Sequence, residues 1–194
     1  MKTRVYIFLI FSVLIACSSE KQNKSATSGN VISEQYNRIL SGTDTAWNEM
    51  MASEDRKIEN IRLMVKELGL IEGSSAKHLE EIKGHLEDLK KSRYDRLSMA
   101  KSNLIDRYDS LTNALIGELR SEINTNKEAV KYQVINQLMH EIQAADDSVL
   151  FLRKAYDRKI DVCKNFVQEN RKKIRKFIPN PDSLKNLNYF RLIP

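Results

Sequence analysis

The chain has 194 residues and a formal net charge of +6, with 30% charged and only 7% aromatic residues. Six glycines and three prolines leave little material for turns. This composition favours long, exposed helices over a compact β-sandwich. No alternating apolar and polar run bounded by turn signals occurs, so we expect no sheet.

The charge is distributed unevenly along the chain. Residues 17–149 contain 18 basic and 22 acidic side chains, a net charge of −4. Residues 150–176 contain 10 basic and 3 acidic side chains, a net charge of +7. We therefore expect a polarised molecule that is acidic over most of its length and basic along its last helix.

The first sixteen residues have the pattern of a secretion signal. Lys2 and Arg4 precede about a dozen almost entirely apolar residues, which is signal-peptide length but shorter than the roughly 20 residues of a membrane-spanning helix. Small Ala16 then precedes Cys17, and the sequence around them resembles the bacterial lipobox. We expect cleavage between Ala16 and Cys17 and lipidation of Cys17. The alternative is an ordinary signal peptide with a cysteine beside its cleavage site by chance.

Lipid attachment would be an adequate anchor. One acyl chain binds a bilayer only marginally, at about 0.8 kcal/mol per buried CH₂, and the lipoprotein modification supplies two or three chains. We expect attachment to the bacterial cell membrane or outer membrane, facing the periplasm or the exterior. With Cys17 acylated only Cys163 remains, so a disulfide framework is excluded. Cys163 lies in an apolar helical register, which favours a buried thiol.

The mature chain divides into three parts by composition. Residues 17–30 are polar without apolar periodicity, and we expect a flexible tether. Residues 31–178 carry helical periodicity and form the expected bundle. Pro179 then ends the last helix, and residues 179–194 form a C-terminal tail.

The first predicted helix covers residues 31–68. A heptad stripe, polar only at Glu54, runs through Trp47, Met51, Glu54, Ile58, Ile61, Val65 and Leu68. We interpret Glu54 as lying at a frayed edge of the core. Residues 41–44 interrupt the stripe and could start a new helix or a kink. Gly69 and Gly73 bracket the following turn, and Ser74 or Ser75 caps the next helix.

Two more long helices are predicted. The second covers residues 75–123, with apolar positions at Leu79, Ile82, Leu86, Leu89, Leu97, Leu104, Tyr108, Leu111, Leu115 and Leu119. Arg93 and Arg96 dilute that stripe, and the segment 124–126 is the only plausible break after it.

The third helix covers residues 127–178. Its stripe contains Val134, Leu138, Ala145, Val149, Leu152, Tyr156, Ile160, Cys163, Val167, Asn170, Ile174 and Phe177. We expect an all-α fold, an elongated antiparallel bundle of three long helices. The alternative is that one helix is split, which gives a four-helix appearance.

Two segments resemble the LemA family. Tyr36-Asn37, Ala46-Trp47 and residues 56–65 are similar to the first-helix signature of that family, and residues 174–190 resemble its closing segment. The match departs from the family where Arg62-Leu63 replaces a Pro-Asn pair. The resemblance implies an elongated helical bundle at a membrane and no established chemistry.

Candidate catalytic and metal-binding groups are few. His78, Glu81 and His85 share one helix face, and a divalent metal would need a further ligand from another helix. The only other histidine, His140, lacks the paired Glu-x-x-His motif of helical metal bundles. Cys163 has no histidine near it in sequence, and no glycine-rich phosphate loop occurs. We expect no enzyme activity, no metal and no cofactor.

The candidate binding surface is a basic run near the end of the last helix. Its five cations are Arg171, Lys172, Lys173, Arg175 and Lys176. They could bind an anionic lipid or glycan, and the alternative is a solvated helix face stabilised by the helix dipole. In a three-helix topology this end is distal to the anchoring membrane. Export argues against nucleic acid as a partner.

We therefore expect a lipid-anchored cell-envelope protein that acts as a non-catalytic, LemA-like scaffold or adaptor. Its partners would be the membrane, through Cys17, and a protein of the envelope. The alternative is a holdase-like periplasmic chaperone or envelope spacer, which should expose apolar surface at open helix tips.

Overall fold

The computed structural model describes residues 16–178 and 187–190, with side chains from Gly29 onward. These residues are all-helical and contain no strand, as the composition predicts. The helices are α1 (Ala16–Leu68), α2 (Ala76–Lys91), α3 (Ser102–Thr125), α4 (Gln133–Glu169) and α5 (Arg171–Phe177), with short 3₁₀ turns η1 (Ser98–Ala100) and η2 (Ala129–Lys131). No described helix has the length and apolarity needed to cross a membrane.

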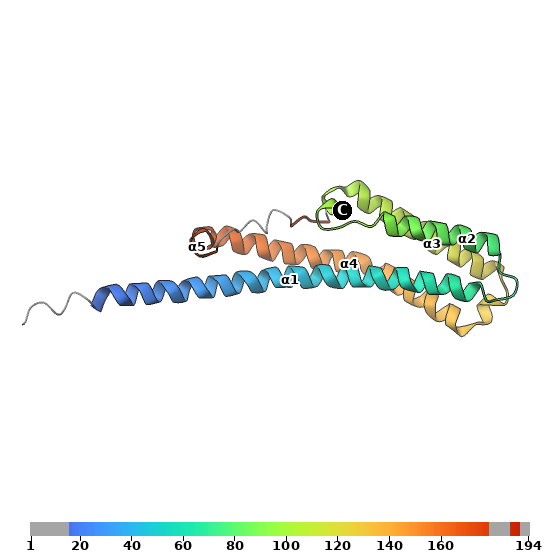
Figure 1. Cartoon of the computed structure of the whole chain (residues 1–194), viewed down its shortest axis with the longest axis horizontal. Coiled ribbons are helices and arrows are strands. Elements are labelled where there is room, and N and C mark those ends of the chain that lie inside the picture. Colours follow the sequence, from blue (N-terminus) through green and yellow to red (C-terminus); the bar gives the residue numbers. More distant parts are fainter. Residues whose placement is uncertain (1–15, 179–186, 191–194) are drawn as a thin grey trace, which may run out of the picture.

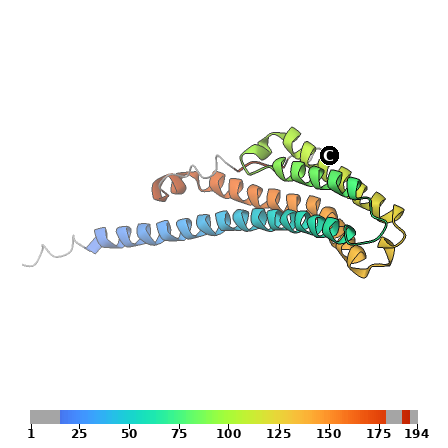
Figure 2. The same cartoon turned by 45° about the vertical axis from the view of Figure 1, so that its right-hand side comes forward.

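Helices α1 and α4 form the long spine of the molecule. They lie side by side and run in opposite directions over most of their length (Figure 1). Helices α2 and α3 form a hairpin against one half of this spine, as Figure 2 also shows. The molecule is therefore a four-helix antiparallel bundle at one end, and the α1–α4 pair alone continues towards the other end.

The predicted second helix is in fact two helices. Helix α2 ends at Lys91, and α3 begins only at Ser102. The intervening turn is held by Asp95, whose Oδ1 accepts hydrogen bonds from the backbone N–H groups of Leu97 (3.0 Å) and Ser98 (2.7 Å). The Ser98 hydroxyl accepts from the backbone N–H of Asp95 (2.8 Å). Helix α2 itself is capped by Ser92, whose hydroxyl donates to the Leu89 carbonyl (2.8 Å), and the break contains neither glycine nor proline.

The two turns at the far end of the bundle lie where the sequence places them. Helix α1 ends before Gly69, Gly73 has a φ of +85°, and the Ser75 side chain caps α2 at the N–H of His78. Asn126 ends α3 and joins both turns, because its Nδ2 donates to the carbonyl of Glu72 (3.2 Å). We call this end of the molecule, residues 69–75 and 126–134, the far tip.

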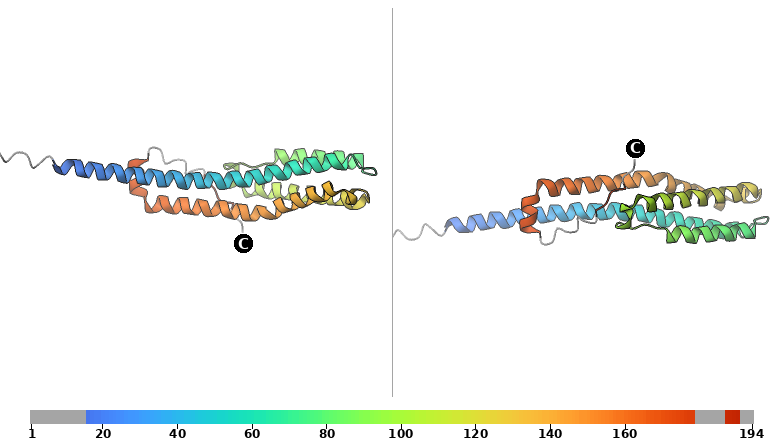
Figure 3. Two further views of the ribbon diagram at one scale, coloured as in Figure 1. Left: turned by 90° about the horizontal axis from the view of Figure 1, so that it is seen from below. Right: turned by 90° about the horizontal axis from the view of Figure 1, so that it is seen from above.

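The predicted third helix is broken at Asn170. The Asn170 side chain donates to the Phe166 carbonyl (3.0 Å), and its backbone leaves the helical region at φ −105° and ψ 17°. Helix α5 then turns away and crosses α1 steeply (Figure 3). The expected arrangement of three long helices is not confirmed, because the second is split and the third is shortened.

The core contains most of the predicted stripes. On α1 the stripe is buried or half-buried throughout, and Leu79, Ile82, Leu86 and Leu89 of α2 are all buried. Leu97 and Val134 are exceptions, being 61% and 42% exposed, because they fall in or beside turns rather than inside a packed helix. Glu54 is buried at 3% exposure, so its interpretation as a frayed edge was wrong.

Helix α1 is continuous through two stretches where the sequence predicts a tether or a possible break. It runs through residues 17–30, the stretch in which the sequence predicts a tether, and extending a formed helix costs far less than nucleating one. It also runs through residues 41–44, where the Thr43 hydroxyl donates to the Leu40 carbonyl (2.7 Å). The expected signal peptide, apart from Ala16, lies outside the described residues. In the tail, Leu187 and Phe190 pack into the core.

Candidate functional site

Helix α5 is held on the spine by its apolar side. Ile174 is 2% exposed and clusters with Ile32 and Tyr36 of α1. A Cβ atom placed on Gly29 would lie only 2.8 Å from Cδ1 of the Phe177 ring, so this glycine allows α5 to approach α1 closely. The crossing helix is therefore a packed element with a defined position.

The other sides of α5 carry all five predicted cations. Arg171, Lys172, Lys173, Arg175 and Lys176 are exposed, and none forms an ion pair with a residue that the structure describes. The one contact of this set is within the helix, where Lys176 Nζ lies 5.0 Å from the centre of the Phe177 ring. These five side chains form a compact charge of +5 that no carboxylate of the described residues pairs with, and we call it the α5 basic surface.

The clustering of five cations without an acidic residue distinguishes α5 from helix α2. On α2, Lys83 lies 2.8 Å from Glu80 and Lys90 lies 2.7 Å from Glu87. In the loop after α2, Arg96 lies 2.6 Å from Asp44. These basic groups face carboxylates one turn away or on a neighbouring helix. The sequence of α5 contains no acidic residue that could do the same.

The position of α5 reverses one expectation. Helix α4 runs antiparallel to α1, so its C-terminal end lies beside the first part of α1. Gly29, which faces Phe177, is 12 positions from Cys17, or about 18 Å along a helix. The basic surface is therefore on the Cys17 side of the molecule. The prediction of a distal basic end was wrong because it counted three helices, and an even number of long helices returns the chain to its starting end.

The far tip carries exposed apolar side chains that the sequence prediction did not single out. Leu70 is 74% exposed, and Val130, Tyr132 and Val134 are 49%, 48% and 42% exposed. All four lie in or beside the two turns that Asn126 joins. Leu70 and Val130 do not belong to the predicted apolar stripes. Their position outside the stripes is the feature of the sequence that could have indicated their exposure.

A network of buried charges crosses the middle of the bundle. Glu54 accepts a hydrogen bond from the Tyr108 hydroxyl (2.8 Å) and lies 3.0 Å from Lys57 Nζ, which also bonds Asp146 (3.1 Å). Burial and the Glu54 carboxylate raise the pKa of Tyr108, which keeps this phenol protonated. The network joins α1, α3 and α4, and each charged member has a partner, so its role is structural.

The C-terminal residues close over a second buried cluster. Phe190 packs against the rings of Trp47, Tyr94 and Tyr156, with centroid distances of 6.3, 5.8 and 5.7 Å. The Arg153 guanidinium lies 5.3 Å from the Phe190 ring centre.

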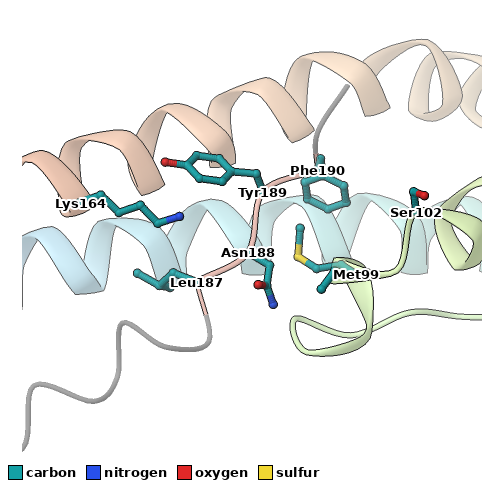
Figure 4. A pocket seen from close by; sticks show the side chains of 8 residues that line it. Met99, Ser102, Lys164, Leu187, Asn188, Tyr189 and Phe190 are labelled. Carbon is teal, nitrogen blue, oxygen red and sulfur yellow. The ribbon is translucent and has the colours of Figure 1, made fainter. Parts of the chain in front are cut away.

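The same four-residue segment also lines a shallow pocket. Leu187, Asn188, Tyr189 and Phe190 face Lys164 of α4 on one side and Met99 and Ser102 on the other (Figure 4). The Tyr189 ring lies under Lys164 Nζ at 3.7 Å. The pocket holds no nucleophile with an adjacent base, and we assign it no chemistry.

The candidate metal-binding histidines face separate carboxylates of α3. His78 Nδ1 lies 2.8 Å from Glu122, and His85 Nδ1 lies 2.8 Å from Glu118. The hydrogen bond that His85 Nδ1–H donates to the Glu118 carboxylate raises the pKa of His85. Within the described residues, no group of three or more His, Cys, Asp or Glu side chains is placed to hold a metal ion.

Cys163 is fully buried, as its register predicts. Burial raises the pKa of its thiol, which disfavours the reactive thiolate. Cys17 lies in the first turn of α1, but its side chain is outside the described residues, so its lipidation stays a prediction.

Comparisons with known proteins add no relative: no family model, no curated protein and no solved structure matches the chain.

Proposed function

We propose that this chain is a lipid-anchored protein of the bacterial cell envelope that acts as a non-catalytic scaffold or adaptor. One observation carries the anchoring: a basic start, an apolar run of signal length, Ala16 and Cys17 occur in the order that lipoprotein processing requires. The LemA resemblance of residues 36–65 and 174–190 is in line with a helical envelope protein, and the name LemA-like belongs to this proposal.

The shape of the body supports binding rather than chemistry. Helix α1 has 53 residues and is about 80 Å long. It separates two surfaces of different character, the α5 basic surface near Cys17 and the apolar far tip. The buried ionisable groups between them are paired with one another inside the bundle. An anchored rod with distinct ends fits an adaptor that presents its far tip to a protein partner.

The alternative is a holdase-like chaperone or a passive spacer. Its supporting observation is the far tip, where four large apolar side chains are 42–74% exposed. Under this alternative the patch binds many unfolded clients, whereas under the adaptor proposal it binds one folded partner. An apolar dye should then bind the purified chain, and the double variant Leu70→Ser/Tyr132→Ser should lose that binding, while Phe151→Ser on α4 should keep it.

Acylation of Cys17 is tested by feeding cells a clickable fatty acid. We expect label on the wild-type protein and none on Cys17→Ser. Cys163→Ser is the matched control, since it removes the only other cysteine and should keep the label. An intact mass that shows an unmodified Cys17 in the membrane fraction would overturn the anchoring.

The adaptor role is tested by photo-crosslinking in cells from Leu70 at the far tip. Lys77, whose side chain is 90% exposed on α2, is the control position. We expect one discrete protein captured from Leu70, none from Lys77, and loss of the capture in Cys17→Ser. Capture of many unrelated clients would move the function to a chaperone, and capture of nothing would favour a spacer.

A further inference from the structure

The α5 basic surface combines a packed position with five cations that form no ion pair within the part of the chain that the structure describes. The buried Ile174 and the close approach of Phe177 to Gly29 fix the helix across α1. The helix has seven residues, and the five cations occupy all of its positions except those of Ile174 and Phe177. A cationic surface that forms no ion pair with the carboxylates of residues 29–178 and 187–190 is available to an external anion.

The distance between the α5 basic surface and Cys17 indicates which anion the surface can reach. The surface is about 18 Å along α1 from Cys17, and the same stretch carries Lys21 and Lys24 in its sequence. Electrostatic attraction to a charged membrane is screened over about 8 Å at physiological salt. An upright α1 would keep α5 beyond this range, whereas a body that leans on the α5 side brings the cations onto the headgroups.

We propose that α5 is a second membrane contact, which binds anionic phospholipid headgroups of the bilayer that holds Cys17 and tilts the body towards it. This inference rests on the proposed lipid anchor. One lipidated residue leaves a rod free to swing about its attachment point, and a second, electrostatic contact restricts that motion. The contact gives the far tip a preferred direction from the membrane surface.

The experiment uses the chain purified from bacterial membranes and reconstituted into vesicles of phosphatidylcholine, with or without a third of phosphatidylglycerol. A fluorescent donor is attached through Gln168→Cys, an exposed position in the last turn of α4 beside α5. Acceptors are placed on lipid headgroups. The donor at Leu70→Cys, on the far tip, is the positional control.

The expected result is higher energy transfer from position 168 in the anionic vesicles than in the neutral ones. Raising the salt to about 1 M, where the screening length falls to about 3 Å, should abolish the difference. Substitution of the five cations of α5 by Gln should abolish it as well. The matched control replaces five lysines outside α5 by Gln and should keep the difference; these are Lys77, Lys83, Lys90, Lys91 and Lys131.

Equal transfer in both vesicles overturns the proposal, as does equal loss in the two five-fold variants, which would show a general charge effect. A response only to an added anionic glycan also overturns it and moves the site to that polymer. The intact mass of the same preparation separates the two claims. If Cys17 is unmodified the anchor fails, while sedimentation of the unanchored chain with anionic vesicles, compared with its α5 variant, still decides whether α5 binds lipid.

Discussion

Arg153 of α4 and Asp109 of α3 form a two-pronged ion pair across 44 positions of sequence. Arg153 Nη1 lies 2.6 Å from Asp109 Oδ2, and Nη2 lies 2.7 Å from Oδ1. Nη2 also donates to the Tyr94 hydroxyl (3.1 Å), and the guanidinium is almost fully buried. The pair joins the α2–α3 hairpin to the spine, and bidentate geometry makes it one of the stronger ion pairs a protein can form.

Asp109→Ala should lower the free energy of unfolding by about 3 kcal/mol, because it leaves the buried Arg153 charge without its counter-ion. The expected cost is at the low end for buried pairs, since the Asp109 side chain is 38% exposed and water can reach it. Denaturant unfolding followed by circular dichroism measures the change. Asp88→Ala removes an exposed partner of Lys91 and should cost less than about 1 kcal/mol. Equal effects of the two variants would contradict the structural role.

Phe190→Ala should destabilise the protein by about 3 kcal/mol, since it removes a 4% exposed ring from the aromatic cluster of Trp47, Tyr94 and Tyr156. The emission of Trp47, the only tryptophan, should also change. Phe151→Ala is the control, because this ring is 65% exposed, and it should change stability little. Unaltered emission and stability in Phe190→Ala would show that the tail does not pack on the core.

Ile174→Ala should detach α5 with little effect on the rest of the bundle. The residue packs on Ile32 and Tyr36 in a small cluster separate from the main core, so the lost contacts are local. Hydrogen exchange should show faster exchange of the backbone amides of residues 171–178, while the amides of α2 and α3 keep their protection. Val162→Ala, at a 53% exposed position of α4, should leave both regions unchanged. Loss of protection along the whole chain would mean that α5 is coupled to the entire bundle.

His85 should make stability depend weakly on pH. Its hydrogen bond to Glu118 raises the folded-state pKa above the ordinary histidine value of 6.5. The contribution is therefore fully present below pH 6.5 and is lost as the pH rises through the folded pKa. Its size should stay below about 1 kcal/mol, because the imidazole is 54% exposed.

The measurement is the melting temperature from about pH 5.5 to about 8.5, together with the imidazole titration of His85. His85→Gln should remove this part of the pH dependence, and His140→Gln, at an exposed position of α4, should leave it. A folded-state pKa of His85 below 6.5 would contradict the pairing with Glu118.

Cys163 should resist thiol reagents in the native protein and react on unfolding, because it is inaccessible and burial raises the pKa of its thiol. The control is the variant Val162→Cys/Cys163→Ala, which moves the thiol by one position to a 53% exposed site and should react at once. Rapid modification of native Cys163 would show that α4 opens readily at this point.

Local chemistry in the sequence determined the helices and the turns of the far tip. A heptad stripe from Trp47 to Leu68 can be buried only as a helix, and the stripe of α2 is buried as predicted. Gly73 predicts the turn because glycine readily adopts a positive φ, and Ser75 predicts it because its side chain caps α2. Both effects depend only on residues close in sequence. The burial of Cys163 follows from the same periodicity.

The tertiary structure decided everything that depends on distant partners. Glu54 lies in the core because Tyr108, 54 positions away, donates a hydrogen bond to it. The residues next to Glu54 in the sequence do not predict that contact. The turn between α2 and α3 gives the bundle an even number of long helices. The basic end therefore returns to the Cys17 side, where Gly29 and Phe177 meet. Periodicity identifies which face of a helix is buried, whereas the partner that covers it is chosen by packing between segments far apart in the chain.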